Sequence, residues 1–334
     1  MPDLTRPRVA ILDDYQGVAL TVADWSAVGG RASLEVFHDH LVGEDEVVAR
    51  LQPFDVVVAM RERTPFPRST LERLPRLRLL VTTADRNASI DVAAASELGI
   101  TVCATRASGA EAAEHTWALI LAAARRLDTE IENVRRGRWM TTLGTSLEDK
   151  RLGVLGLGRL GARVAAVGLA FGMDVVAWSE HLDEARCREV GVGLAGSLDD
   201  LLASSDVVTI HLVLSRRTRG LIGARELALL RPTAWLVNTS RGPIVDEDAL
   251  VEALSHDRIG GAALDVFAEE PLPADHPLRT LPRVIATPHL GYVTDLAYGR
   301  WYQDAADDVV AYLDGEPVRV LNPPAPRGEP TPPR

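Results

Sequence analysis

The sequence carries a glycine pattern whose spacing suits the binding of a pyrophosphate. Gly156, Gly158 and Gly161 form a G-x-G-x-x-G that follows an apolar run directly and opens a predicted helix. At such a turn the first glycine permits the bend, the second lets the backbone approach the phosphates, and the third allows helix and strand to pack. Ala162 and Arg163 stand where a P-loop would have Lys and Ser or Thr. The pattern therefore predicts a dinucleotide site, with an ordinary glycine-rich turn as the alternative.

The next predicted strand indicates which dinucleotide is bound. The run DVVAWS ends at Ser179, where an acid would be the simple signature of NAD, and Glu180 comes one residue later. No Arg or Lys follows until Arg186. A 2′-phosphate would then meet the Glu180 carboxylate with no adjacent cation, so charge repulsion disfavours NADP. We expect NAD as the cofactor.

Three further stretches place polar residues at the ends of predicted strands, where ligands of open α/β sheets collect. They are NTSRGPIVDEDAL (238–250), ALDVFAEEPLP (263–273) and TPHLGYV (287–293). Taken alone, Arg241 could be a surface charge at a helix N-terminus, and Glu270 a solvated acid before a proline. His289, between a strand and a glycine, could equally be a structural histidine.

Taken with the glycine loop, these stretches resemble the D-isomer specific 2-hydroxyacid dehydrogenase family, which includes phosphoglycerate, glyoxylate, formate and phosphite dehydrogenases. The resemblance runs from about residue 55 to 321 and is most specific across 152–292. It implies that Arg241 clamps the substrate, that His289 is the acid/base, and that Glu270 is its partner. Further cofactor contacts that it implies are Arg159, Leu160, Leu212, Thr218 and Thr239, with Asp265 at the nicotinamide carboxamide.

The chemistry of keto-acid reduction needs these residue types. A hydride must reach carbon and a proton must reach oxygen, and a protonated imidazole is a fitting donor near neutral pH. Glu270 beside His289 would favour the charged imidazolium by attraction. The planar guanidinium of Arg241 matches a 2-keto carboxylate bidentately, which Lys cannot do. The predicted activity is hydride transfer between NAD(H) and a small 2-hydroxy or 2-keto acid, with the D-isomer expected.

The loop that would bind the substrate carboxylate departs from the family pattern. The resemblance implies a glycine-rich loop after a strand of the first domain, but residues 82–91 (TTADRNASID) contain no glycine. Ala84 and Arg86 fall where glycines are usual, and Asp85 adds a negative charge. We take Ala84, Arg86, Asn87 and Arg61 as candidate substrate residues; Arg61 and Arg63 could equally be solvated loop charges.

Two rival functions remain open at this level. A dinucleotide-sensing protein of the family's corepressor-like branch would keep Arg241, Glu270 and His289, so these residues do not exclude it. A phosphite-type dehydrogenase is also open, whereas Glu270 argues against a formate dehydrogenase, in which Gln is typical. The sequence does not name the acid, because fold says little about ligand.

These residues must be positioned by alternating strands and helices. Apolar, β-rich runs over 9–12, 55–60, 77–83 and 100–104 form a first βα series, and a second begins at Leu152. The second series predicts strands over 152–158, 174–179, 206–212, 234–240, 260–266 and 283–290, with helices over 160–172, 183–190, 224–230 and 246–256. The predicted fold class is α/β, with two doubly wound parallel-sheet domains: a Rossmann NAD-binding domain and a discontinuous flavodoxin-like substrate domain.

The domain bounds follow from these two series. We expect a substrate domain from 1–106, the Rossmann domain from 107–292, and a return to the substrate domain over 293–322. The return would use a long helix near 295–313 and an apolar run near 318–321. The closing residues 323–334 (PPAPRGEPTPPR) are expected to form a flexible tail.

The amino-acid composition limits the kinds of partner that this protein can bind. A net charge of -11 over 334 residues argues against nucleic acid and anionic membranes. No run reaches the ~18 apolar residues of a membrane span, and no signal region is evident, so we expect a cytoplasmic protein. Cys103 and Cys187 lack metal-binding spacing, so no metal is expected. Helix 111–126 is apolar nearly all round, which predicts that it packs against its twin in a homodimer.

Overall fold

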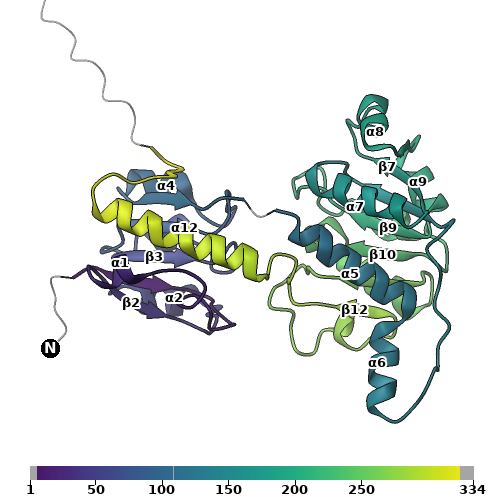
Figure 1. The fold of residues 1–334 in the computed structure, drawn as a ribbon, viewed down its shortest axis with the longest axis horizontal. Helices are drawn as coiled ribbons and strands as arrows, with labels where there is room; N and C mark the ends of the chain where they lie inside the picture. Colours follow the sequence, from purple (N-terminus) through teal and green to yellow (C-terminus); the bar gives the residue numbers. More distant parts are fainter. Residues whose placement is uncertain (1–5, 108, 324–334) are drawn as a thin grey trace, which may run out of the picture. The chain divides into compact units, whose positions relative to one another are not determined.

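The computed structural model describes residues 6–107 and 109–323. Within these residues the chain forms two compact units (Figure 1). Unit 1 contains residues 6–107 and 294–323, and unit 2 contains residues 109–293. The tail expected over 323–334 lies, after Pro323, outside the described residues.

Unit 1 is built on a five-stranded parallel sheet in the order β2-β1-β3-β4-β5. This is the flavodoxin-like order, in which a switch of direction between β1 and β3 opens the carboxyl edge to ligands. Two of the three inner strands, β3 and β4, are buried along their whole length because helices cover the two faces of the sheet. The strands are β1 (Arg8–Ile11), β2 (Ser33–Val36), β3 (Val56–Ala59), β4 (Leu79–Thr82) and β5 (Thr101–Ala104). The helices are α1 (Ser26–Gly29), α2 (Glu44–Leu51), α3 (Arg68–Leu71), α4 (Val92–Glu97) and α12 (Asp295–Leu313).

The C-terminal segment returns to this sheet. Figure 1 shows the yellow helix α12 beside the purple and blue elements of unit 1. Trp301, which is fully buried on α12, donates from Nε1 to the carbonyl of Arg106 at 2.9 Å. Beyond α12, Val320 forms an antiparallel bridge with Cys103 of β5, and Leu321 N donates to Val102 O at 2.8 Å. Unit 1 is therefore discontinuous in sequence.

Unit 2 contains a seven-stranded parallel sheet in the order β12-β11-β10-β9-β6-β7-β8. Six of its strands follow the Rossmann order, and β12 extends one edge. The strands are β6 (Arg151–Leu155), β7 (Asp174–Trp178), β8 (Gly193–Leu194), β9 (Val207–Ile210), β10 (Trp235–Asn238), β11 (Gly261–Leu264) and β12 (Val284–Ala286). The prediction of a Rossmann domain and a discontinuous flavodoxin-like domain, both doubly wound, is confirmed.

The helices of unit 2 cover both faces of its sheet. They are α5 (Glu111–Arg125), α6 (Leu127–Arg135), α7 (Arg159–Ala170), α8 (Glu184–Val190), α9 (Leu198–Ser204), α10 (Ala224–Leu227) and α11 (Glu247–Ser255), with short 3-10 turns η1 (Gly242–Ile244) and η2 (Pro277–Arg279). The apolar side chains of α5 pack mainly inside the unit, against α7 and the sheet: Trp117 is buried and donates to Val164 O at 3.1 Å. The apolar character of α5 is thus largely explained by burial within one chain.

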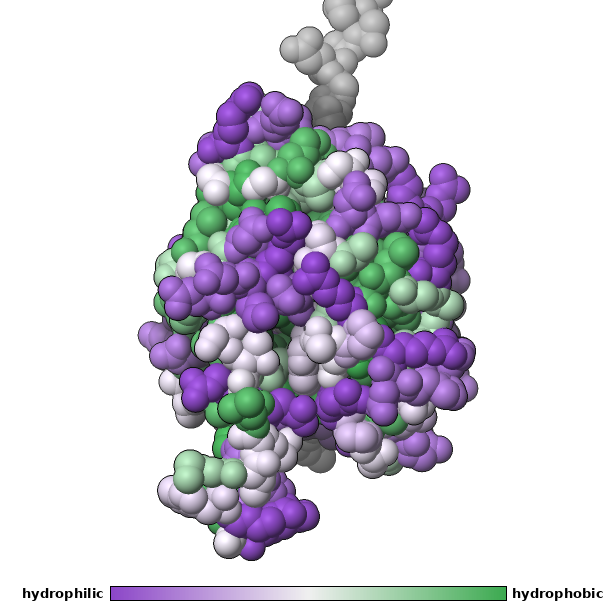
Figure 2. Space-filling model, turned by 90° about the vertical axis from the view of Figure 1, so that its right-hand side faces the viewer, coloured by the Kyte–Doolittle hydropathy of each residue, from purple (hydrophilic) through white to green (hydrophobic). Residues whose placement is uncertain are grey.

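Exposed apolar side chains gather instead in the segment after α5. The end of unit 2 in Figure 2 carries green patches among purple ones, and the lobe at the bottom, which contains α6, mixes pale, green and purple residues. The large exposed apolar residues here are Leu127, Ile131, Val134, Trp139, Met140 and Leu143. Among the described residues, no helix combines the length and hydropathy needed to cross a membrane.

Candidate active site

The glycine loop joins β6 to α7 with the steric requirements of a phosphate-binding turn. Gly156 has a φ of 96°, in the left-handed region, and a Cβ there would lie 2.8 Å from the carbonyl oxygen of His211. A Cβ at Gly161 would overlap the carbonyl of Gly156, so the first and third glycines are required by the fold. A Cβ at Gly158 would meet nothing within 4 Å. Gly158 therefore leaves open space at the N-terminus of α7, which fits the approach of a pyrophosphate.

The other predicted cofactor residues lie around this loop on the carboxyl edge of the sheet, and several are already engaged. Arg159 donates to Gly109 O at 3.2 Å, and half-buried Leu160 lies next to it. The carbonyl of Leu212 accepts from the Ser240 hydroxyl. The hydroxyls of Thr239 and Thr218 also bond to other groups of the protein. Thr239 Oγ1 lies 2.7 Å from Thr116 Oγ1, and Thr218 Oγ1 donates to Val213 O at 2.7 Å.

The adenosine end of the site differs from the sequence-based expectation. Ser179 is half-buried after β7, and Glu180 Oε2 lies 3.0 Å from a guanidinium nitrogen of Arg217. The expectation that no cation adjoins this strand end is wrong. Arg217 follows β9, and β9 and β7 flank β6 in the sheet, so their carboxyl ends share one edge. In the same region burial lowers the pKa of His211 to about 4, so this histidine is neutral at physiological pH.

Three strand ends bring the predicted catalytic stretches to one edge. Asn238, Leu264 and Ala286 are in register as the last residues of β10, β11 and β12. Because the strands are parallel, the stretches that follow them, with Arg241, Glu270 and His289, leave the sheet on the same side.

His289 and Glu270 form a close pair. Nδ1 of His289 lies 2.5 Å from Oε2 of Glu270, and the other carboxylate oxygen accepts from Phe267 N at 2.9 Å. The ring of Tyr292 stands edge-on to His289 with centroids 5.3 Å apart. The side chains of His289 and Glu270 are 24% and 33% exposed, so the pair is oriented by its neighbours yet open to a ligand.

The loop that carries His289 is held by Asp265, which is fully buried. One carboxylate oxygen accepts from Leu290 N at 2.7 Å and from Thr287 Oγ1 at 2.6 Å, and the other accepts from Gly291 N at 2.8 Å. Burial alone would raise the pKa of this carboxyl, but hydrogen bonds from His115, Thr287 and the backbone hold it below its ordinary value. In this structure both oxygens of Asp265 are engaged by the protein.

His115 is a site residue that sequence analysis did not select. Its Nε2 lies 3.1 Å from Asp265 Oδ1 and 2.9 Å from Thr287 Oγ1. It lies on α5, and it is 150 residues earlier in the chain than Asp265. No local motif could have paired them, because the contact depends on where α5 crosses the sheet.

Arg241 lies in a loop that touches the Glu270 segment. Asn238 brackets this loop: its amide donates to Arg241 O at 3.0 Å, and its Oδ1 accepts from Ser240 N at 3.0 Å. A Cβ at Gly242 would overlap the backbone of Phe267, so a glycine is needed where the two loops meet. Arg241 donates from its guanidinium to Ser240 O at 2.7 Å.

The candidate substrate loop of unit 1 takes a strained conformation without glycine. Ala84 is buried with a φ of 66°, and its N–H donates to Thr105 Oγ1 at 2.7 Å. Asn87 donates to Arg61 O at 2.5 Å and to Thr82 Oγ1 at 2.9 Å, which ties the loop to the end of β3.

The next three backbone N–H groups of this loop differ from that of Ala84 in their hydrogen bonding. Within residues 6–107 and 109–323, no acceptor is found for the N–H groups of Asp85, Arg86 and Asn87. The side chains of Asp85 and Arg86 are exposed. The guanidinium of Arg61 stands 5.7 Å from the Trp301 ring centroid. Successive N–H groups of this kind form a concavity suited to an anion.

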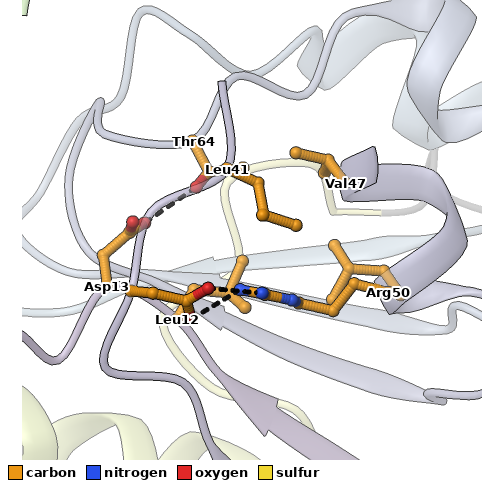
Figure 3. Close-up of a pocket in the computed structure, with 8 residues that line it drawn as sticks. Leu12, Asp13, Leu41, Val47, Arg50 and Thr64 are labelled. Carbon is orange, nitrogen blue, oxygen red and sulfur yellow. Dashed lines mark hydrogen bonds and ion pairs between the residues drawn. The ribbon is translucent and has the colours of Figure 1, made fainter. Parts of the chain in front are cut away.

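Unit 1 also has a small pocket between the end of β1 and α2 (Figure 3). Its polar groups pair with one another: Thr64 Oγ1 donates to Asp13 at 2.7 Å, and Arg50 forms a two-point ion pair with Asp39. We assign this pocket no ligand. The described part of the chain contains no group of three or more His, Cys, Asp or Glu side chains placed to hold a metal.

Comparison with known proteins agrees with this fold. Residues 117–291 match the model of the D-isomer specific 2-hydroxyacid dehydrogenase NAD binding domain. A glyoxylate reductase of Aeropyrum pernix is 45% identical over 263 residues, which cover 75% of this chain and 78% of the relative. A D-3-phosphoglycerate dehydrogenase of Methanocaldococcus jannaschii is 38% identical over 80% of this chain and 50% of the relative. The crystal structure of a phosphoglycerate oxidoreductase from Vibrio cholerae superposes with a TM-score of 0.88, at 36% identity over 92% of this chain and 99% of that one.

The fold and the glycine loop thus define an NAD-binding oxidoreductase. The chain belongs to the D-isomer specific 2-hydroxyacid dehydrogenase family and is an NAD-dependent oxidoreductase. It spans about half the length of the M. jannaschii phosphoglycerate dehydrogenase that it matches.

Proposed function

We propose that this chain reduces a small 2-keto acid with NADH, with glyoxylate as the first substrate to test. The observation that carries the proposal is the His289–Glu270 pair at 2.5 Å, on the same sheet edge as the glycine loop. The choice of glyoxylate is supported by the name of the A. pernix relative. Glyoxylate should give glycolate, which has no stereocentre, and a longer 2-keto acid should give the D-2-hydroxy acid.

The nicotinamide, when bound, supplies the hydride. His289 supplies the proton: because Nδ1 faces Glu270, the proton given to the substrate oxygen is held on Nε2. Glu270 orients the ring and stabilises the imidazolium by opposite charge. Phe267 N, which donates to Glu270 at 2.9 Å, keeps that carboxylate in place.

The substrate is held by its carboxylate in this proposal. Arg241 offers a planar guanidinium that can bind the carboxylate and carbonyl oxygens of a 2-keto acid bidentately. In unit 1, the backbone N–H groups of residues 85–87 are our candidate donors to an anion, with Ala84 setting their direction. Arg61 and Arg86 contribute positive charge. Unit 2 is then the cofactor domain and unit 1 the substrate domain.

We further propose a homodimer. The exposed apolar residues between Leu127 and Leu143 are a better candidate surface than α5, since Leu143 is 96% exposed whereas Trp117 of α5 is 6% exposed. A second copy meeting this segment about a two-fold axis would cover the same residues on both chains. Light scattering at micromolar concentration should give twice the chain mass, and Leu143→Asp with Met140→Asp should give a monomer. A monomeric wild type would contradict the proposal.

Absorbance at 340 nm tests the activity. Wild-type protein with NADH should turn over glyoxylate or another short 2-keto acid. Arg241→Lys keeps the charge but loses the bidentate fork, so both weaker substrate binding and slower chemistry are expected. NADH binding without turnover of any keto acid would instead indicate a sensor, and reduction of NAD+ by phosphite would indicate a phosphite-type enzyme.

A further inference from the structure

The loop after β9 places a cation against the acid at the adenosine end of the cofactor site. Residues 215–220 read SRRTRG, and Arg216, Arg217 and Arg219 are all exposed. A guanidinium nitrogen of Arg217 lies 3.0 Å from Glu180 Oε2 and 3.3 Å from His181 Nε2. Glu180 and His181 are the second and third residues after the end of β7.

Arg217 is presented by an ordered turn. The Thr218 hydroxyl accepts from Ser215 N at 2.8 Å and donates to Val213 O at 2.7 Å, which closes the turn. Arg186, the nearest cation in sequence, is committed elsewhere: its Nε donates to Leu157 O at 3.2 Å and its guanidinium pairs with Glu189 at 2.7 Å. Arg217 is therefore the cation that the structure shows paired with Glu180.

This pairing changes the electrostatics of the site. An acid at the end of the second Rossmann strand favours NAD because it accepts from the ribose 2′-hydroxyl and repels a 2′-phosphate. Here Ser179 takes the strand-end position, and the charge of Glu180 is compensated by Arg217. The side chains of Glu180 and Arg217 are 58% and 67% exposed, and ion pairs this exposed are worth little and open readily.

We propose that Arg217 is a specificity-determining residue that lets this site accept a 2′-phosphorylated dinucleotide, NADP(H), in addition to NAD(H). When a 2′-phosphate is present, the guanidinium exchanges the Glu180 carboxylate for phosphate oxygens, which its fork of donors suits. The Ser179 hydroxyl donates to the same group. The inference rests on the dinucleotide site and does not depend on which acid is reduced.

Calorimetric binding of two fragments separates this inference from catalysis. Adenosine 2′,5′-bisphosphate carries the 2′-phosphate, and 5′-AMP lacks it. The wild type should bind the two with affinities within about tenfold of each other. Arg217→Gln should weaken the bisphosphate by about tenfold or more and 5′-AMP by less than about twofold. Glu180→Gln should tighten the bisphosphate, because Arg217 is released.

Arg219→Gln is the matched control, since it removes another exposed arginine from the same loop. It should leave the preference between the two fragments near the wild-type value. Equal weakening of both fragments in Arg217→Gln, an equal loss of bisphosphate binding in Arg219→Gln, or a wild type that rejects the bisphosphate by more than about a hundredfold would each overturn the proposal. The ratio of kcat/KM for NADPH to that for NADH should fall in Arg217→Gln in parallel with the binding data.

Discussion

The glycine loop of unit 2 and the loop over residues 83–87 of unit 1 both leave a parallel strand at its carboxyl end, yet they hold their backbones differently. In the first, a Cβ at Gly161 would overlap the Gly156 carbonyl, so glycine is imposed by close packing of backbone on backbone. In the second, Ala84 adopts a φ of 66° and is held there by a hydrogen bond to Thr105. A position with a left-handed backbone can thus hold alanine where there is space for the Cβ. A position where two backbone segments touch, such as Gly161, cannot.

The largest effect is expected from Gly161→Ala. The added methyl group must displace the Gly156 carbonyl, which should destabilise unit 2 by about 3 kcal/mol or more and abolish dinucleotide binding. Gly158→Ala is the matched control, because its methyl group meets nothing within 4 Å and should leave the melting temperature near that of wild type. Only NADH affinity should fall in the control. Normal NADH binding by Gly161→Ala would show that the contact between residue 161 and the Gly156 carbonyl is not tight.

These loops also show what sequence could predict. Strand-to-helix turns, long apolar strands and the helix α12 are local patterns, and the structure contains them. The elements without bounds in the sequence prediction include β2, β8, α6 and α9. β2 is a half-exposed edge strand, β8 has two residues, α6 is polar with exposed apolar positions, and α9 has seven residues.

The site, like the fold, could be predicted from the sequence where the signal is local and not where it depends on long-range contacts. The spacing of Arg241, Glu270 and His289 along the chain was informative, but the contacts of His115 with Asp265 and of Arg217 with Glu180 were not. Both contacts join residues that are distant in sequence, and they follow from strand order and helix placement.

A second large effect is expected at Asp265, which fixes the His289 loop as Thr105 fixes Ala84. Asp265→Asn puts an amide N–H₂ against the N–H of Leu290 or Gly291, so the loop should shift and kcat/KM should fall about a hundredfold. NADH affinity, measured by fluorescence, should change much less. Unchanged kcat/KM would show that the loop is held by other contacts.

The same carboxyl predicts a pH dependence. The pKa of Asp265 is below its ordinary value in the folded protein, so its stabilising contribution is present at neutral pH. That contribution is lost as pH falls through the ordinary aspartate range toward the folded value. Urea unfolding between pH 6 and about pH 3 should therefore be less pH-dependent for Asp265→Asn than for wild type.

A moderate effect is expected from Thr105→Val. The buried N–H of Ala84 loses its acceptor, which should cost about 1–3 kcal/mol in urea unfolding and raise KM for the keto acid. Thr101→Val, on β5, is the control and should cost less. If the two variants were equally stable, the left-handed residue would not depend on Thr105.

The smallest effect is expected from Ala84→Gly. Relief of the left-handed conformation gains about 1–2 kcal/mol, and the greater freedom of glycine in the unfolded chain offsets about 0.5–1 kcal/mol of it. Stability should therefore rise by about 1.5 kcal/mol or less, with NADH affinity unchanged. Ala84→Val should be clearly destabilising, because a β-branched residue tolerates this φ poorly. Equal stability of the two variants would contradict the strained backbone.

The most direct test of the proposed catalytic role of His289 is to measure both kcat/KM and NADH affinity for His289→Ala. Loss of the proton donor should lower kcat/KM for the keto acid by about 10²–10⁴, while NADH binding stays within about twofold of wild type because the glycine loop is intact. His289→Gln, which retains a polar side chain facing Glu270, should be equally slow. Turnover near the wild-type rate in either variant would contradict the assignment of His289 as the acid.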